Sequence, residues 1–310
     1  MSRQSKRTIT PLRIILLLVV LIGIYYILPQ LGAFRNTFTV LRHVSWLWLL
    51  VGLLASGLSF IAAAVTQFAA GGLSGRFSNI TLLQFAGSFV NHFLPFSFGG
   101  INLTARYYQK LGKRQGQGIT MATIPVIFGI ITTIIMVAIV SPITLAHLAG
   151  KFHFSHLSIW VIPPVIATLV ISVLVISKYR QKARELIQEA LAGLKGIRDI
   201  RQLTLLITGS VSITLMSACA LLAAIMAIHA SIGLVAVFVL YVTASLVSNV
   251  APTPDGIGAT EAVLVLGLVA ARLSLPQAAA ATLIFRFMTF WLPIIPGGLA
   301  LHRLNRQKAL

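Results

Sequence analysis

The chain has 310 residues, of which 57% are hydrophobic and 9% charged, and its mean hydropathy of +0.95 excludes a soluble globular domain. In a soluble protein the formal net charge of +19 would indicate nucleic-acid binding, but here the basic residues collect between apolar runs, as in cytoplasmic loops of membrane proteins. We therefore expect membrane lipids as partners and no nucleic acid. The single cysteine, Cys219, lies in an apolar run, which excludes an intrachain disulfide and a cysteine-cluster metal site.

Repeated apolar runs predict an all-α polytopic membrane protein with one integral membrane domain over 1–310, because about 20 helical residues cross about 30 Å of hydrocarbon. About eight spans are expected, at 12–29, 46–70, 119–146, 157–177, 203–229, 232–250, 259–273 and 276–301. The first follows a basic stretch without a convincing cleavage site, so we interpret it as a retained helix. The 259–273 segment is short and is expected to be tilted or half-buried.

The segment 80–98 is apolar but is broken by Pro95 and the Gly99-Gly100 pair, so it is either a re-entrant hairpin or a short span. Lys and Arg cluster at the N-terminus, at 106–114, at 178–201 and at the C-terminus. All four clusters can be cytoplasmic only if 80–98 enters and leaves on the same side. The clusters therefore favour a re-entrant segment in an inner-membrane protein with both termini in the cytoplasm.

The stretch 178–201 is a basic loop whose apolar residues have helical spacing. Two interpretations stay open. It is either an amphipathic helix on the inner membrane surface or a solvated connector that obeys the orientation rule.

The segment NVAPTPDGIGATE interrupts the apolar chain with two prolines, two glycines and two acids. Such a break is costly in lipid, so we expect it to face a wet or protein-lined cavity. The helix after the break presents unpaired N–H groups that attract an anion, although both acids could instead only cap that helix. A mixed role, with one acid structural and the other facing the cavity, also stays open. Its candidate binding residues are Asn249, Pro252, Asp255, Gly256, Gly258 and Glu261.

A weak internal repeat relates the two broken segments, since 90–99 aligns with 247–256 without gaps. Both copies place Asn, Pro and Gly between an apolar run and an ionisable residue. Paired interrupted segments of this kind point to an inverted repeat and to a transporter's site at the membrane midplane. The candidate residues of the first copy are Asn91, Pro95, Gly99, Gly100 and Arg106, which precedes two tyrosines expected at the headgroup level. Arg106 either holds a phosphate or is an ordinary positive-inside arginine.

Arg286 lies within the last apolar span, where an arginine must pair, snorkel or face water. Glu261 is the partner that we expect and Asp255 is the alternative, because the other acids lie in the basic loop. The pair either lines the cavity or is purely structural.

The motif PFSFGG followed by Arg106, the motif PTPDGIGATE, and Arg286 with a terminal PGG together resemble the flippase-like lysylphosphatidylglycerol synthase transmembrane-region family over about 10–305. The family pattern reads Pro-Gly-Gly-hydrophobic-Gly with a downstream Glu. Gly256, Gly258 and Glu261 match it, whereas Asp255 replaces the first glycine, which raises the question of the local turn geometry. The resemblance implies a multi-span bundle that moves a lipid headgroup between leaflets. In two-domain relatives a separate cytoplasmic aminoacyltransferase domain makes the lysyl-lipid.

We therefore expect a flippase-like protein, not an enzyme and without cofactor or metal, that translocates a phospholipid or other lipid headgroup through a central polar cavity. Arg106, Glu261 and Arg286 would handle the headgroup. A cationic headgroup would favour a free Glu261, whereas an anionic one would favour the two arginines. Two alternatives stay open: an accessory subunit of a separate lipid or glycan transferase, and a proton-coupled solute transporter with Glu261 as the carrier.

Overall fold

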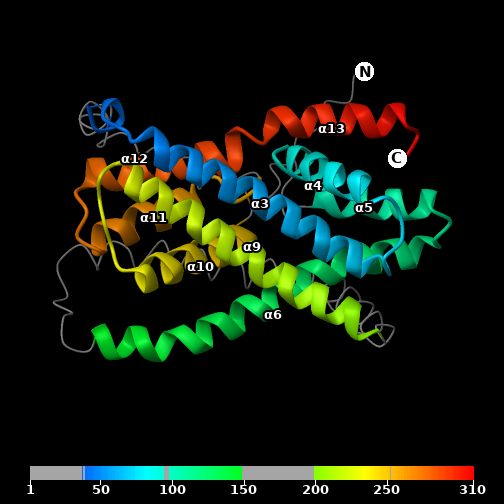
Figure 1. Ribbon diagram of the computed structural model, residues 1–310, viewed down its shortest axis with the longest axis horizontal. Helices are drawn as coiled ribbons and strands as arrows, with labels where there is room; N and C mark the ends of the chain where they lie inside the picture. Colours follow the sequence, from blue (N-terminus) through cyan, green and yellow to red (C-terminus); the bar gives the residue numbers. More distant parts are fainter. Residues whose placement is uncertain (1–36, 38, 94–97, 149–198, 252) are drawn as a thin grey trace, which may run out of the picture.

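The computed structural model describes residues 37, 39–93, 98–148, 199–251 and 253–310 (Figure 1). The predicted spans 12–29 and 157–177 and almost all of the basic loop 178–201 lie outside these residues. The described chain is helical throughout its regular structure, as the apolar runs predict. The helices are α3 Trp46–Ala70, α4 Phe77–Asn91, α5 Phe98–Lys110, α6 Gln115–Leu148, α9 Ile200–Ala227, α10 Leu234–Val250, α11 Ala259–Ala270, α12 Leu275–Arg286, the π-helix η2 Phe287–Trp291 and α13 Ile294–Arg306.

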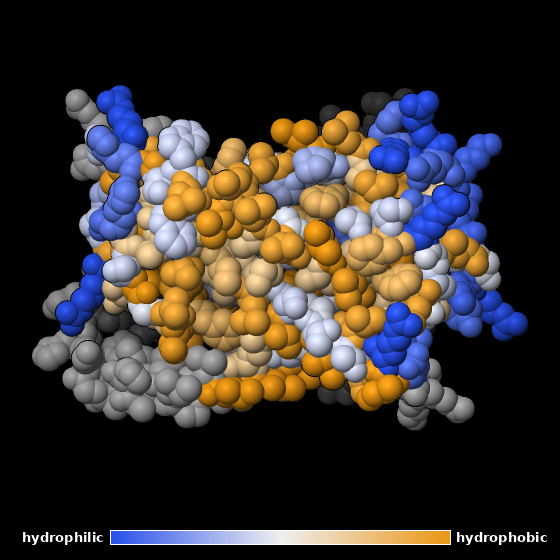
Figure 2. Space-filling model, viewed as in Figure 1, coloured by the Kyte–Doolittle hydropathy of each residue, from blue (hydrophilic) through white to orange (hydrophobic). Residues whose placement is uncertain are grey.

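The described helices form an apolar body with hydrophilic ends, which agrees with the predicted all-α membrane fold. Four helical stretches are long and apolar enough to cross a membrane: Trp46–Ala70, Gln115–Thr133, Ile200–Ala227 and Leu275–Arg306. Two shorter apolar helices, Leu234–Ser248 and Ala259–Ala270, accompany them. Figure 2 shows apolar side chains across the middle of the molecule and hydrophilic ones at the two ends of its long axis. The number of about eight spans stays a prediction.

Helices α3 and α9 pack along each other in opposite directions and form the centre of the fold. At one end the N–H of Ser45 donates to the carbonyl of Ala227 at 2.9 Å. Towards the other end Gly209 lies directly against Thr66, so that a Cβ at Gly209 would overlap the threonine hydroxyl. Small residues of this kind let two membrane helices approach closely.

Helices α4 and α5 form an antiparallel hairpin, and whether this hairpin is re-entrant in the membrane stays a prediction. Near its tip the side-chain oxygen of Asn91 accepts the N–H of Gly100 at 2.7 Å. At its outer end Ile80 of α4 and Tyr107 of α5 share one buried cluster. Both outer ends therefore lie at the same end of the molecule. Tyr107 and Tyr108 are 2% and 0% exposed, so their side chains pack inside the protein, and their position at the headgroup level stays a prediction.

Helices α10 and α11 form a second hairpin that opens at the opposite end. Its outer residues, such as Val237, pack with Ile228 at the end of α9 and with Leu41 and Val44 ahead of α3. In Figure 1 the α4–α5 hairpin lies towards the end at which α13 finishes, and α10 and α11 lie towards the other end. The two broken segments thus enter the fold from opposite ends, and the inverted repeat stays a prediction.

The last long helical stretch is interrupted in its middle. After Arg286 the chain makes the π-turn η2 and resumes as α13 beyond Pro293. A proline inside a helix lacks the N–H that would bond to the carbonyl four residues earlier. In the π-helix each bond spans five residues, as between the N–H of Leu292 and the carbonyl of Phe287, so Pro293 leaves the carbonyl of Met288 without a backbone donor. The hydroxyl of Ser56 in α3 donates to this carbonyl at 3.0 Å. The break is therefore supported by a neighbouring helix.

The contact between α13 and α4 yields a stability prediction. A Cβ added to Gly297 would lie 2.6 Å from the backbone oxygen of Phe85 and 2.7 Å from the Cβ of Phe89. We expect Gly297→Ala to lower stability by about 1–3 kcal/mol, because neither atom can move without shifting a helix. The control is Gly129→Ala in α6, where a Cβ meets nothing within 4 Å. That change should raise stability by about 0.5–1 kcal/mol through helix propensity. Thermal melting of the purified protein in detergent measures both, and shifts of the same sign would contradict the α4–α13 packing.

Candidate functional site

Arg286 is a buried charge deep in the fold. It is 7% exposed and ends α12, about 16 Å along the helical stretch that begins at Leu275, by the helical rise of 1.5 Å per residue. An arginine that far from a helix end cannot reach water by extending its side chain. Its charge must therefore be compensated within the protein.

Glu261 supplies that compensation and caps a helix at the same time. Its Oε1 accepts from Nε of Arg286 at 2.5 Å. Its Oε2 accepts the N–H of Gly258 at 2.6 Å, at the first turn of α11. The structure thus brings together the expected pair, and the capping role that stood as the alternative holds as well. Both carboxylate oxygens are occupied.

The remaining face of the Arg286 guanidinium has one aromatic contact and one free donor. Its Cζ lies 4.1 Å from the ring centroid of Phe290, which is a favourable cation–π distance. Its Nη2 is buried and has no hydrogen-bond partner. A buried, unpaired donor costs about 1–3 kcal/mol, and more when charged, so it marks a place where a polar group binds.

Three threonines close in sequence to Glu261 or Arg286 also have buried hydroxyls without a hydrogen-bond partner. They are Thr253 in the break, Thr260 next to Glu261, and Thr282 one turn before Arg286. Among the described residues, the only other side-chain atom in this condition is the hydroxyl of Ser210. Unsatisfied polar groups therefore concentrate on the elements that carry the ion pair.

The turn that precedes α11 keeps the backbone expected of a glycine-rich motif. Asp255 has φ +48° and Gly256 has φ +69°, both in the left-handed region. Aspartate is one of the few residues other than glycine that tolerates this conformation. Gly256 also lies so close to Ser248 that a Cβ would come within 2.7 Å of the serine Cα. Asp255 therefore replaces a glycine without changing the turn.

The carboxylate of Asp255 is available to a ligand. No hydrogen bond or ion pair of this side chain occurs within the described part of the chain, although its backbone carbonyl accepts from the Ser248 hydroxyl at 3.2 Å. Arg286, His92 and Glu261 are close enough for their charges to act on it. Asp255 thus lies within electrostatic range of the ion pair without bonding to it.

His92 and Phe290 connect the first hairpin to this site, and neither is among the predicted binding residues. The two rings are in contact, tilted by 39° with centroids 3.9 Å apart, and Nε2 of His92 lies 3.0 Å from the carbonyl oxygen of Phe290. The other ring nitrogen lies 2.6 Å from the carbonyl of Ser88. A histidine next to Asn91 in an apolar segment was a usable signal, whereas Phe290 carried none.

Arg106 lies away from the ion pair. It is exposed, six residues beyond Gly100 in α5, which is about 9 Å along the helix. Its neighbour Tyr107 belongs to the buried cluster at the outer end of the hairpin. No hydrogen bond or ion pair among the described residues joins Arg106 to Glu261 or Arg286. The three charged residues therefore do not form one site as expected.

The other candidate residues are placed as follows. Gly99 and Gly100 begin α5, and Asn249 lies in the last turn of α10, where its side chain is not described. Pro95 and Pro252 lie outside the described residues.

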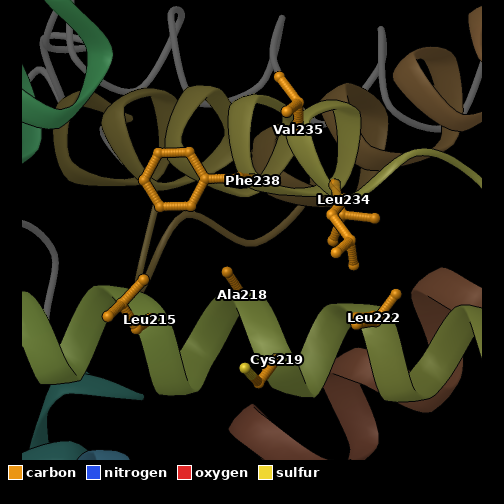
Figure 3. Close-up of a pocket in the computed structure, with 8 residues that line it drawn as sticks. Leu215, Ala218, Cys219, Leu222, Leu234, Val235 and Phe238 are labelled. Atoms are coloured by element: carbon orange, nitrogen blue, oxygen red, sulfur yellow. The ribbon is translucent and has the colours of Figure 1, made fainter. Parts of the chain in front are cut away.

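A pocket between α9 and α10 is apolar and distinct from the ion pair. Its volume is about 340 Å³, and Leu215 and Leu222 of α9 face Leu234 and Phe238 of α10 across it (Figure 3). This lining accepts hydrocarbon and offers nothing to a charged group. In the part of the chain that the structure describes, no group of three or more His, Cys, Asp or Glu side chains could hold a metal ion.

The comparison with protein families agrees with these features. A family model described as the lysylphosphatidylglycerol synthase TM region matches residues 13–297, which include both hairpins and the ion pair. The chain belongs to this family. Comparison with curated proteins finds no match. As a member of the lysylphosphatidylglycerol synthase transmembrane-region family, it is a membrane protein of lipid modification or translocation.

The ion pair yields a second stability prediction. Glu261→Gln should lower stability by about 2–4 kcal/mol, because it leaves the buried charge of Arg286 unpaired. Arg286→Met should lower it less, by about 1–2 kcal/mol, because the Glu261 side chain that loses its partner is 32% exposed. The double variant should lose clearly less than the sum, since both charges are then gone. Thermal or denaturant unfolding of the four proteins measures this cycle. The control is Arg303→Met, an exposed arginine in α13, which should change stability by no more than about 0.5 kcal/mol. Strictly additive losses would contradict a coupled pair.

Proposed function

We propose that this protein moves a lipid headgroup between the two leaflets at the place where its two hairpins approach the last helix. The observation that carries the proposal is the buried Arg286, which is paired with Glu261 but keeps one guanidinium nitrogen without a partner. A charge of this kind inside a membrane protein marks a substrate pathway more often than a structural contact. Membership of the lysylphosphatidylglycerol synthase transmembrane-region family supports the same class of substrate.

The arrangement of the hairpins supports transport over simple binding. One hairpin opens at each end, and the tip residue His92 of the first contacts Phe290 beside Arg286, while Asp255 of the second faces the same arginine. A headgroup that enters from either end would have only one hairpin to pass before it meets the polar groups. Inverted segments around a central site are the arrangement by which transporters expose one site to alternate sides.

The distribution of basic residues supports an orientation. One end of the described structure carries Lys110, Lys113, Arg114, Arg201, Arg303, Arg306 and Lys308. The other end carries Arg42 and Arg272. By the positive-inside rule, the first end faces the cytoplasm. The proposal thus places the C-terminus, and with the basic N-terminal sequence also the N-terminus, on the cytoplasmic side of an inner membrane.

Cysteine labelling tests this orientation. In a Cys219→Ser background, Arg42→Cys and Arg114→Cys place single thiols on exposed positions at opposite ends. We expect a membrane-impermeant maleimide to label the Arg42→Cys variant in intact spheroplasts. The Arg114→Cys variant should react only after permeabilisation, because it lies at the basic end. The reverse pattern would contradict the orientation.

A vesicle assay tests translocation. The full chain is reconstituted into liposomes with head-labelled fluorescent phospholipids, and the fraction accessible to an impermeant quencher is followed in time. We expect the protein to raise the exchange rate above that of empty vesicles and Arg286→Gln to remove the increase, since the polar contact at the midpoint is lost.

The control is Arg114→Gln, which removes a positive charge at an exposed position away from the ion pair and should retain exchange. Folding of every variant is verified by its melting profile. Exchange in the Arg286→Gln protein equal to that of the wild type would refute the site, and no exchange above empty vesicles in any protein would refute the proposed function.

A further inference from the structure

The site's two acids have different roles, and this decides which of them can meet a substrate. Both oxygens of Glu261 are engaged, one by Arg286 and one by the N–H of Gly258. Asp255 makes no side-chain hydrogen bond or ion pair among the described residues. A headgroup cation would therefore meet Asp255, and Glu261 would stay with the arginine.

Arg286 and two neighbouring helix residues supply the free hydrogen-bond donors of the site. Nη2 of Arg286 is a charged donor without a partner, and the hydroxyls of Thr260 and Thr282 add neutral groups on the helices that carry the ion pair. An arginine with a free N–H and hydroxyls nearby suits an oxygen of a phosphodiester. The side chain of Arg286 is more than nine-tenths buried, so its unpaired nitrogen is shielded from bulk water.

The sum of charges excludes a purely anionic guest. Arg286 brings one positive charge, whereas Asp255 and Glu261 bring two negative ones. The site therefore has no surplus positive charge, and an anionic headgroup would add an uncompensated charge in a medium of low dielectric. A guest that carries one charge of each sign leaves the balance unchanged.

We infer that the site takes a zwitterionic phospholipid headgroup, with the phosphodiester on Arg286 Nη2 and a primary ammonium on Asp255. The inference rests on the proposed function, and it names the substrate class of that same site. A primary ammonium has three N–H donors for a carboxylate, whereas a quaternary ammonium has none and needs free aromatic faces. Phe290, an aromatic ring at the site, already contacts the guanidinium of Arg286 and the ring of His92.

The free carboxylate also explains why an aspartate occupies a left-handed position in this turn. A glycine would adopt φ +48° at less cost, and it would remove the only carboxylate of the described residues that faces Arg286 without bonding to it. Asp255 thus combines a left-handed backbone with a carboxylate that makes no hydrogen bond or ion pair among the described residues.

Lipid competition on the purified full chain tests the inference. Phosphatidylethanolamine, phosphatidylcholine and phosphatidylglycerol with identical acyl chains are added in equal amounts, and bound lipid is quantified by native mass spectrometry. We expect phosphatidylethanolamine to be bound about tenfold more than either competitor, since a hydrogen bond to a charged group has that order of effect. Asp255→Asn should remove this preference and leave phosphatidylglycerol binding at or above its wild-type level. Asparagine is the matched change, because it has the same shape and also tolerates the left-handed backbone.

Two results would overturn the inference: phosphatidylglycerol or phosphatidylcholine bound as well as phosphatidylethanolamine by the wild type, or an unchanged preference in the Asp255→Asn protein. Arg286→Lys should lower binding of both phosphatidylethanolamine and phosphatidylglycerol. Unchanged binding would show that the phosphate does not bind Arg286. Excess glycerophosphoethanolamine should fail to displace the lipid, whereas displacement at equal concentration would show a soluble substrate in place of a lipid. A wild-type preference without exchange in the vesicle assay would support the headgroup class and refute transport, so the two proposals fail separately.

Discussion

One buried positive charge constrains this structure. Arg286 lies in the middle of an apolar helical stretch, where an arginine costs at least about 2.5–3.5 kcal/mol in membrane-insertion scales unless it is paired. The pairing requires Glu261, and Glu261 can reach the arginine because α11 begins there, in the interior of the fold. The helix start in turn requires the chain to stop and turn between α10 and α11. The break in the sequence and the charge in the last helix are thus two parts of one requirement.

The backbone around this charge is irregular and is supported by side chains. Asn91 holds the N–H of Gly100 across the first break, and Ser248 donates to the carbonyl of Asp255 across the second. Ser56 binds the carbonyl of Met288 in the π-turn. Irregular backbone is tolerated at membrane depth only where other groups satisfy it or where it lines a polar space. π-turns within helices occur often at functional sites, and this one places Phe290 under the guanidinium of Arg286.

Much of this arrangement could be predicted from the sequence, because charge is scarce in the chain. Only Asp255 and Glu261 lie near apolar segments, so Arg286 had two candidate partners, of which Glu261 was the expected one. The apolar run of α3 has the same bounds, 46–70, in the sequence and in the structure. Tertiary detail was beyond such reasoning. The contact between His92 and Phe290 joins residues 198 positions apart, and the π-turn that presents Phe290 has no local signature. The position of Arg106 also depends on where the glycines of α5 lie in the hairpin, and the number of residues between Gly100 and Arg106 does not give that depth.

The double engagement of Glu261 bears on which parts of the site could change during transport. If Glu261 left Arg286 to meet a substrate, the fold would lose a helix cap and a buried ion pair together, and both losses are costly. Asp255 and the free Nη2 of Arg286 carry no such obligation, because no contact of the described fold is lost when they bind a guest. The contact of His92 with Phe290 is also small, one ring pair and one hydrogen bond at the end of a hairpin. In the proposed function the Glu261–Arg286 pair therefore stays fixed, and the hairpin tips on either side of it are the elements whose displacement opens one route or the other.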